Sequence, residues 1–281
     1  MKKILVLCLT FVMAMSVLAG CGSKEAVTAK VIDIELTNED YAFGVDKTQP
    51  ELLEKTNAFI AEIKANGTFE EICNKYFGDG TPTAVTSAKE DPSKDQLVVA
   101  TNAAFEPFEF MQGDNYVGID MEIAALLAEY LGKELVIQNM DFDAVCLAVG
   151  QQKCDIAMAG LTINEEREEF VTFTDSYYSA SQKLIVTSDN TEFDACTDAA
   201  AVEAILNGKD DKVKVGVQTG TTGQLYCEGD ADWGFTGYGM STIGYKNGSL
   251  AVQDLLNGGL DYVIIDAAPA DRIVEEINKM Q

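Results

Sequence analysis

Short apolar segments alternate with amphipathic segments along most of the chain, and this alternation constrains the fold more than any other feature. Brief apolar runs are typical of buried strands, whereas apolar residues three and four apart indicate helices. We expect strands at 96–101, 135–139, 155–159, 182–187, 214–218 and 262–265, and helices at 121–131, 144–150, 199–207, 250–257, 268–279 and from 224 on. Strands that alternate with helices form doubly wound α/β sheets, in which ligands bind at the carboxyl ends of the strands.

The segment from Asp155 to Arg167, DIAMAGLTINEER, is the most informative junction between a strand and a helix. Gly160 follows the strand and lets another group approach the backbone closely. Asn164 is suited to cap a short helix whose first turn carries Arg167. Because a cation in a first helical turn opposes the macrodipole, we expect an anion against it. The anion is either a neighbouring glutamate or a ligand carboxylate held by the guanidinium beside free backbone N–H groups.

The beginning of the chain has the features of a secretory leader. Two lysines precede an apolar run at 4–15, which is too short for a comfortable membrane span. We therefore assign 1–20 to a signal peptide. The sequence LAGC that ends at Cys21 resembles the lipobox of bacterial lipoproteins, which implies that Cys21 becomes the lipidated first residue of a tether at 21–29. The alternative is a signal cleaved near Gly20, beside an incidental cysteine.

The charge balance excludes several classes of function. The chain has 20 Lys and Arg against 46 Asp and Glu, a net charge of −26, and no histidine. An acidic surface repels nucleic acid and anionic lipid headgroups, so we do not expect nucleic-acid binding. The absence of histidine excludes Ser-His-Asp and Cys-His nucleophiles and histidine metal sites, which removes most hydrolases. We expect neither a metal nor a cofactor.

The cysteines give little support for either a metal site or a disulfide framework. Of 7 cysteines, Cys8 lies in the leader and Cys21 at the predicted anchor. The remainder is an odd number without CxxC spacing. The sequence does not decide whether Cys196 pairs with Cys227, or whether other cysteines pair.

The part of the chain that follows the tether has its own strand and helices. An alternating strand at 30–36 and helices at 50–66 and 68–77 precede the polar stretch TPTAVTSAKEDPSKD. That stretch has no apolar face and is rich in Ser, Thr, Lys, Asp and Pro, which is typical of a flexible linker. The longer alternation of strands and helices starts after it.

A series of motifs over 96–281 resembles, in order and spacing, the extracellular amino-acid-binding proteins that feed ABC importers, bacterial solute-binding family 3. The motifs are TNAAFEPF at 101–108, GID at 118–120, DFD at 141–143, AGLT at 159–162 with Arg167, QTGTT at 218–222 and IID at 264–266. The resemblance implies a two-lobed periplasmic-binding-protein-like fold, in which two crossover strands join two doubly wound sheets. It also implies a hinge near Tyr41 and Ala180 that closes the lobes around a ligand.

One block of the resemblance stands out of order. In that family the segment that resembles 30–82 closes the protein, whereas here it comes first. A circular permutation accounts for this, because the same contacts form in either chain order when the usual termini lie close together. The alternative is a family member with an unrelated N-terminal segment. The permutation implies lobe one at 43–82 and 96–182, lobe two at 30–40 and 183–281, and a linker at 83–95 that joins the family's usual termini.

The resemblance also implies where an amino acid would bind. Arg167 corresponds to the residue that takes the ligand carboxylate, helped by backbone N–H groups of Thr162 and Thr222. Asp266 corresponds to the acceptor of the ammonium, together with the Thr162 hydroxyl and the Gly160 carbonyl. From its strand position alone, Asp266 could equally be an exposed aspartate. The other implied ligand-binding residues are Asn102, Phe105, Phe142, Ala159, Gln218 and Thr221.

Two pairs of these residues bear on the choice of ligand. Phe105 and Phe142 correspond to aromatic residues that sandwich the ligand, and Asn102 and Gln218 would face its side chain. Relatives selective for cations have aspartate at the position of Asn102, so the amide favours a polar or glutamine-like amino acid. Glu106 and the acidic surface keep cationic amino acids possible.

These expectations lead to two classes of function. The first is a monomeric, lipid-anchored receptor at the extracellular face of the cytoplasmic membrane, which binds a free polar L-amino acid and delivers it to an ABC permease and its ATPase without performing chemistry. The second is a dehydratase on the same fold that acts on a small carboxylate. A dehydratase needs an acid over the leaving hydroxyl, and the acids that we place near the cleft are Asp266 and Glu106.

Overall fold

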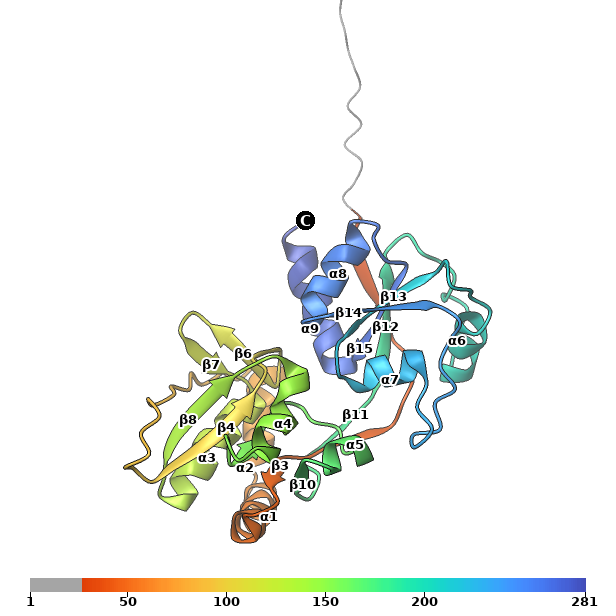
Figure 1. Cartoon of the computed structure of the whole chain (residues 1–281). Helices are drawn as coiled ribbons and strands as arrows, with labels where there is room; N and C mark the ends of the chain where they lie inside the picture. The colour runs from red at the N-terminus through yellow and green to blue at the C-terminus, as the bar shows by residue number, and fades with distance from the viewer. Residues whose placement is uncertain (1–26) are drawn as a thin grey trace, which may run out of the picture.

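The computed structural model describes residues 27–281, and the predicted leader and the predicted lipidation site at Cys21 lie outside that range. The described chain forms two lobes, each built around a mixed five-stranded sheet with helices packed on it (Figure 1). This is the two-lobed α/β architecture that the sequence predicts.

Lobe one contains the sheet with strand order β10-β3-β9-β4-β8. Its strands are β3 (Gly44–Asp46), β4 (Gln96–Thr101), β8 (Glu134–Asn139), β9 (Ile156–Ala157) and β10 (Val171–Phe173). Its helices are α1 (Pro50–Ala65), α2 (Thr68–Phe77), α3 (Ile119–Leu131), α4 (Val145–Gly150), α5 (Glu165–Glu168) and the short 3₁₀ helix η1 (Phe142–Ala144). β4 runs parallel to β8 and β9, so the ends of these strands meet at one edge of the sheet.

Lobe two contains the sheet with strand order β1-β12-β15-β13-β14. Its strands are β1 (Ala29–Ile32), β12 (Gln182–Thr187), β13 (Lys214–Gln218), β14 (Ser241–Tyr245) and β15 (Tyr262–Asp266). Its helices are α6 (Ala199–Leu206), α7 (Thr222–Glu228), α8 (Gly248–Leu256) and α9 (Ala267–Lys279). Alternate residues of β15 enter different cores, since Val263 packs with residues of α8 and α9 and Ile264 packs with residues of α6 and α7.

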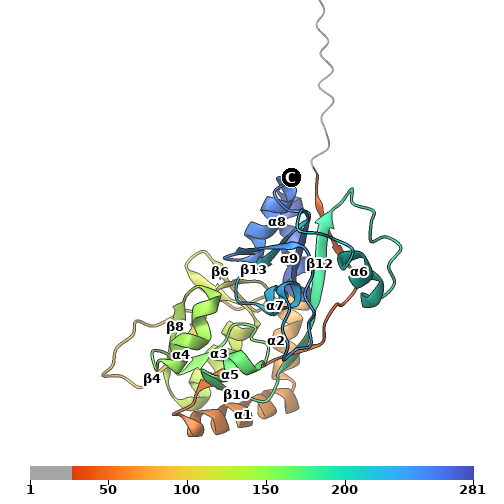
Figure 2. The same cartoon turned by 45° about the vertical axis from the view of Figure 1, so that its right-hand side comes forward.

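Residues before the predicted linker contribute to both lobes. β1 pairs with β12 in lobe two, and β3 lies between β9 and β10 in lobe one. α1 and α2 pack against each other and against α3. The two ends of the described chain lie together (Figures 1 and 2), because the side chain of Asn278 hydrogen-bonds to the N–H and the carbonyl of Ala29 at 3.0 and 2.8 Å.

Two antiparallel crossover strands connect the lobes. β2 (Glu39–Tyr41) pairs with β11 (Tyr178–Ala180), so that Tyr41 lies opposite Tyr178 and Glu39 lies opposite Ala180. In β2 the side chains of Glu39 and Tyr41 are buried and that of Asp40 is exposed, as the alternation of a strand requires. The crossovers therefore lie where the sequence predicts the hinge.

The helices begin and end where local chemistry favours it. Pro50 occupies the first turn of α1, where its missing N–H would have had no partner. Leu52, Phe59 and Ile63 are buried on one face of that helix, which is the helical spacing predicted from the sequence. Asn247 caps α8 by accepting a hydrogen bond from the N–H of Leu250 at 3.0 Å.

Several predicted elements differ from the structure. The predicted strand at 155–159 is regular only over Ile156–Ala157, and the predicted strand at 30–36 ends at Ile32, where the N–H of Ile34 donates to the Ile32 carbonyl at 2.8 Å. Sequence analysis missed β3, β10 and β14 and the small sheet formed by β5 (Ala104–Phe105), β6 (Glu109–Gln112) and β7 (Asn115–Val117), and it expected β2 and β11 only as crossovers near Tyr41 and Ala180. Most of these strands are too short for an alternating pattern, and β14 is an edge strand without a fully buried residue.

The segment at 83–95 has no helix or extended strand, as predicted, but it is not free of the fold. Val85 is buried and forms a β-bridge with Tyr116. The N–H of Ala88 donates to the carbonyl of Leu135 at 2.8 Å, and the hydroxyl of Ser87 accepts from the N–H of Ile137 at 2.8 Å. The prediction of a flexible linker was therefore wrong for 85–88, which follow lobe one closely.

Candidate functional site

The predicted site residues gather where the two lobes meet. Lobe one contributes Asn102, Phe105, Phe142, Ala159, Gly160, Thr162 and Arg167, and lobe two contributes Gln218, Thr221, Thr222 and Asp266. All of them are buried except Phe142, which is half-buried. Most follow the carboxyl ends of strands, the edge at which α/β sheets bind ligands.

Arg167 is the buried cation of this region. Asn164 caps α5 by accepting from the N–H of Arg167 at 2.8 Å, as predicted. The guanidinium donates from Nη1 to the Thr162 carbonyl at 2.6 Å and from Nη2 to the Gly220 carbonyl of lobe two at 3.0 Å, and it lies over the ring of Phe142 at 5.2 Å. Among residues 27–281 no carboxylate lies within 4.0 Å of Arg167. The alternative of a neighbouring glutamate is therefore wrong, because the glutamates of α5 are exposed.

Gly160 brings the backbone of lobe one against an aromatic ring. Its φ is +55°, and a Cβ at this position would lie 2.9 Å from the ring of Phe105. The N–H of Gly160 donates to Asp120 Oδ2 at 2.9 Å, and the hydroxyl of Tyr177 donates to the other oxygen at 2.7 Å. Burial raises the pKa of Asp120 to about 7, although both hydrogen bonds oppose the shift. Sequence analysis quoted the GID motif but assigned Asp120 no role.

Asn102 and Gln218 contact each other across the lobes. Nε2 of Gln218 donates to Oδ1 of Asn102 at 3.0 Å, and Nδ2 of Asn102 donates to the carbonyl of Met140 at 2.7 Å. Within residues 27–281, Oε1 of Gln218 is buried without a hydrogen-bond partner. Thr221 precedes α7 and donates its hydroxyl proton to the Gln218 carbonyl at 2.8 Å, and Thr222 starts the helix. A buried acceptor without a donor is unfavourable, so a group that donates a hydrogen bond to this oxygen would stabilise the region.

Asp266 lies among acidic and phenolic side chains. Oδ1 of Asp266 accepts from the hydroxyl of Tyr41 at 2.5 Å. The carboxylate of Glu39 accepts from the hydroxyls of Thr37 and Thr162 at 2.6 and 2.7 Å and from Nε2 of Gln182 at 3.0 Å. Burial, followed by the charge of Glu39, raises the pKa of Asp266 above its ordinary value. The alternative of an exposed strand-end aspartate is wrong, because Asp266 is 4% exposed.

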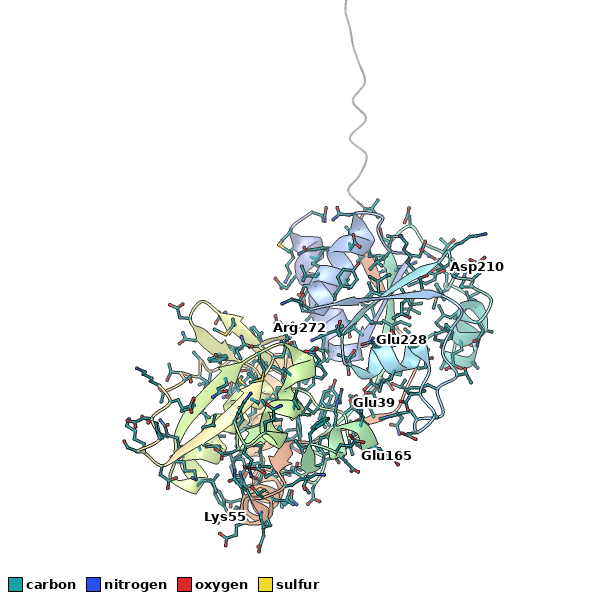
Figure 3. The ribbon with its side chains drawn as sticks, viewed as in Figure 1. Glu39, Lys55, Glu165, Asp210, Glu228 and Arg272 are labelled. Atoms are coloured by element: carbon teal, nitrogen blue, oxygen red, sulfur yellow. The ribbon has the colours of Figure 1, made fainter. Side chains whose placement is uncertain are left out.

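Glu39 is a buried acidic residue beside the predicted site that sequence analysis did not single out. It is 2% exposed and lies between the lobes in the view of Figure 3. Its polar neighbours Asn38 and Asp40 are exposed, so the local sequence resembles a solvated turn. The one available signal was the position of Glu39 two residues before Tyr41, on the same face of a strand.

A further carboxyl group lies in the same core. Glu109 in β6 is fully buried, and neither of its oxygens has a hydrogen-bond partner in the described part of the chain. Burial raises its pKa well above the ordinary range, and the charges of Asp120 and Asp266 raise it further. The buried, unpaired position of Glu109 therefore favours its protonated form, because an unpaired buried carboxylate is costly.

Glu106 faces a different part of the interface from the one expected. It lines a cavity of about 350 Å³ with residues of β6, α8 and α9, among them Arg272 and Glu276. Burial raises its pKa, and Arg272, which lies between the lobes in Figure 3, lowers it. The expectation that Glu106 lies near the cleft and keeps cationic amino acids possible therefore has no contact with the predicted site residues to support it.

Two other cavities flank the lobes. A cavity of about 270 Å³ opens beside Arg167, lined by Phe142, Leu161, Gly220 and Gln224 among others. A cavity of about 670 Å³ lies under the segment at 83–86, between α2 and α3, and none of the predicted site residues line it. We therefore associate the smaller cavity, and not the larger one, with the site.

The remaining sequence expectations concern cysteines and membrane contact. Within residues 27–281 all the cysteines are free, so Cys196 and Cys227 are not paired. No group of three metal-ligating side chains is found in that range. Over the same residues, every helix is too short or too polar to span a bilayer.

Comparisons with known proteins place this geometry in a family. Residues 97–275 match the family described as bacterial extracellular solute-binding proteins, family 3. The arginine-binding extracellular protein ArtP of Bacillus subtilis (strain 168) is 34% identical over 110 residues, which are 39% of this chain and 43% of that protein. The match covers less than two thirds of the length of ArtP and of the first curated arginine- and histidine-binding relatives that follow it.

Solved structures agree with this assignment. An ancestral arginine-binding protein bound to arginine has a TM-score of 0.55 and 34% identity, covering 65% of this chain and 75% of that one. The ancestral amino acid-binding protein AncCDT-1, a precursor of cyclohexadienyl dehydratase, has a TM-score of 0.55 and 29% identity over the same shares. The chain belongs to the bacterial extracellular solute-binding proteins of family 3.

Proposed function

We propose that the protein is a lipid-anchored extracellular receptor that binds a free polar L-amino acid between its two lobes and delivers it to an ABC permease. One observation carries the proposal. The buried guanidinium of Arg167 has no carboxylate partner, and the buried carboxylates of Glu39 and Asp266 have no cationic partner within 4.0 Å in residues 27–281. An amino acid is a zwitterion and would supply both missing charges.

Hydrogen bonds through Thr162 and Tyr41 connect the cationic end of the proposed site, at Arg167, with its acidic end, at Glu39 and Asp266. The Thr162 carbonyl accepts from Arg167, and the Thr162 hydroxyl donates to Glu39. Thr162 also forms a β-bridge with Tyr41, whose hydroxyl donates to Asp266. On this proposal Arg167 takes the ligand carboxylate with the Thr222 N–H, and Asp266 takes the ammonium with the Thr162 hydroxyl and the Gly160 carbonyl.

The polar and aromatic groups beside these ends would select the ligand side chain. Phe105 and Phe142 offer ring faces, and Asn102 and Gln218 offer amides of which one oxygen lacks a donor. A ligand that donates an N–H to Oε1 of Gln218 would satisfy it. Named relatives and neighbours bind arginine, histidine or glutamine, and side chains of all three can donate such a bond.

Closure of the lobes would sequester the ligand. Contacts such as those from Arg167 to Gly220 and from Gln218 to Asn102 join the lobes, so binding would replace them with contacts to the ligand. We place the hinge at the paired crossovers β2 and β11, near Tyr41 and Ala180.

We also propose that the chain is a circular permutation of the family's usual order. The family match starts at residue 97, yet 29–77 supply strands and helices to both lobes. Asn278 holds Ala29 next to the last helix, so the ends of the described chain are close enough to have been joined in the usual order. The segment at 83–95 would then join the family's usual termini. We retain lobe one as 43–82 and 96–182 and lobe two as 30–40 and 183–281.

The remaining parts of the proposal concern the cellular context. Residues 1–20 would be removed as a signal peptide, and Cys21 would anchor a monomer at the extracellular face of the cytoplasmic membrane through the tether at 21–29. The permease and its cytoplasmic ATPase would then take up the amino acid. Labelling with a radioactive fatty acid, compared between the native chain and Cys21→Ser, tests the anchor.

A dehydratase is the second candidate, because one neighbouring structure is named as a precursor of cyclohexadienyl dehydratase. Asp266, whose pKa is raised, would have to act as the acid over the leaving hydroxyl. Incubation with prephenate, which a dehydratase would convert to phenylpyruvate with loss of water and carbon dioxide, followed by detection of phenylpyruvate tests this function. We expect no turnover, since Asp266 serves to bind the ammonium.

A thermal-shift screen against the standard amino acids tests the main proposal. A ligand that binds only the folded protein must raise the melting temperature, by an amount that grows with its concentration. We expect a shift with at least one polar L-amino acid and none with its D-enantiomer. The absence of a shift with every standard amino acid, confirmed by calorimetry, would contradict the proposal.

A further inference from the structure

Glu39 gives the acidic end of the site a second buried carboxylate. We infer that Glu39 and Asp266 act together, that Asp266 holds a proton while the site is empty, and that the ammonium of the ligand displaces this proton when it binds. The inference rests on the proposed function, because it concerns the same amino-acid site. It makes Glu39 a ligand-positioning residue that no local sequence pattern reveals.

Strand geometry places the two carboxylates together. Glu39 and Tyr41 lie on the same face of β2, and the hydroxyl of Tyr41 donates to Asp266 at 2.5 Å. Gln182 pairs with Asp266 between β12 and β15, and its side-chain amide donates to Glu39 at 3.0 Å. Glu39 and Asp266 are thus connected on two sides, through Tyr41 and through Gln182.

Glu39 is the member of the pair with more hydrogen-bond donors around its carboxyl group. Three donors, from Thr37, Thr162 and Gln182, point at its two oxygens. A carboxylate that accepts several hydrogen bonds is stabilised in its charged form. Asp266 accepts from Tyr41 and lies beside that charge, so Asp266 is where a proton relieves the repulsion.

The groups around the pair do not supply a competing cation. Lys183, on the strand beside Asp266, directs its ammonium to Asp33 at 2.7 Å and Asp271 at 3.5 Å. Arg167 is occupied by the carbonyls of Thr162 and Gly220. The other ionisable groups that act on the pair or on its neighbours are Tyr41, Glu109, Asp120 and Tyr177. These are phenols and carboxyl groups, which cannot carry a positive charge.

The proton balance of the step is simple. The empty site carries Asp266 as a carboxylic acid beside the Glu39 carboxylate. The ligand arrives with a protonated amine and forms an ion pair with both carboxylates, and the Asp266 proton leaves to solvent. No bond to carbon forms or breaks. Up to one proton is therefore released for each ligand bound, and binding tightens as the pH rises.

Isothermal titration calorimetry in buffers of different ionisation enthalpy measures this proton directly. The probes are L-arginine and L-glutamine, with 5-guanidinopentanoate and glutaramate as analogues that lack the ammonium. For the amino acid that binds, we expect release to approach one proton at about pH 6 and to become small near about pH 8, where the ligand amine is still protonated. The analogues should release no proton and bind at least roughly 100-fold more weakly.

Glu39→Gln is the decisive variant, and Asp40→Asn is its matched control. Both remove one charge from β2, but Asp40 is exposed and points away from the pair. We expect Glu39→Gln to lose more than half of the proton release at about pH 6 and about tenfold in affinity at about pH 8. Asp40→Asn should behave as the native protein does.

The native measurement stands even if Glu39→Gln fails to fold. A binding heat of the native protein that is the same in all buffers from about pH 6 to 9 overturns the inference and leaves the proposed function intact. The same is true if Glu39→Gln and Asp40→Asn release equal numbers of protons. If no standard amino acid binds, the proposed function fails, and this inference fails with it.

Discussion

The two ends of the proposed site are satisfied in opposite ways. At the cationic end, carbonyl oxygens and an aromatic face surround Arg167. At the acidic end, Glu39 and Asp266 repel each other, and Glu109 lies near enough to be affected. Neutral acceptors stabilise a guanidinium at any pH, whereas buried like charges are relieved only by a proton or a cation. The charge at the cationic end is therefore the same at any ordinary pH, whereas the charge at the acidic end depends on pH.

The largest expected effect is at the cationic end. Arg167→Ala should weaken amino-acid binding by more than about 100-fold, because charged hydrogen bonds to the ligand carboxylate contribute roughly 1.5–3 kcal/mol each. Arg272→Ala is the matched control, since Arg272 contacts Tyr76 and Glu275 away from the site. We expect that variant to bind within about threefold of the native protein. Unchanged affinity of Arg167→Ala by calorimetry would contradict the assignment.

The acidic end should show a somewhat smaller effect. Asp266→Asn keeps the shape of the side chain but removes its charge, which leaves the ligand ammonium paired only with Glu39. We expect a loss of about 2–3 kcal/mol of binding free energy at about pH 8, measured by calorimetry. A loss below about 1 kcal/mol would place the ammonium elsewhere.

Sequence analysis predicted the cationic end better than the acidic end, for a physical reason. The cap at Asn164 and the cation in the first turn are local, so Arg167 could be singled out within a few residues. The burial of Glu39 depends on Thr162 and Gln182, which are 123 and 143 residues away in the chain. Contacts over such separations have no local pattern, and the resemblance, although it includes 30–82, assigned no role to Glu39.

The secondary structure shows the same difference between elements that have a local sequence pattern and elements that have none. Helices such as α2 and strands such as β4 and β13 start and end where predicted, because each has a complete apolar face. The short crossovers β2 and β11 have no such face and were recognised only as a hinge. The flexible linker expected at 83–95 follows lobe one because Val85 fills a buried position that composition does not reveal.

The free energy of unfolding should also depend on pH, because the buried carboxyl group of Asp120 titrates near neutral pH. Burial raises the pKa of Asp120 to about 7 in the folded protein, above the ordinary aspartate value of about 3.9, so the folded state binds more protons between these values. Its contribution to stability is complete below about pH 4 and is lost as the pH rises to about 7, at no more than about 1.4 kcal/mol per pH unit. Urea unfolding of the ligand-free protein should therefore show lower stability at about pH 8 than at about pH 5.

Variants separate this effect from the general repulsion of an acidic protein. Asp120→Asn should flatten the decline of the free energy of unfolding with pH, whereas Asp40→Asn removes the same charge from the surface and should not. Equal slopes in the two variants would show that the decline does not come from Asp120.

Gly160 packs against the ring of Phe105, and its substitution should have a moderate effect. Ala at this position combines a φ of +55° with a Cβ 2.9 Å from the ring of Phe105. Gly113 has a φ of +62° with nothing within 4 Å of its Cβ position, so Gly113→Ala measures the backbone cost alone. We expect Gly160→Ala to be less stable than Gly113→Ala by about 1–2 kcal/mol in urea unfolding. Equal losses would mean that Phe105 moves freely, which would weaken its role beside the ligand.

The smallest effect should come from an ion pair that crosses the lobes outside both ends of the site. Lys246 lies 3.2 Å from Asp141, but the two side chains are 74% and 61% exposed. Exposed pairs contribute little, because water and salt screen them. Lys246→Ala should therefore change amino-acid affinity by less than about twofold at physiological salt. A loss of about tenfold would show that closure depends on surface charge as well as on the buried ends, and the contrast between Arg167 and Asp266 would then explain only part of the binding.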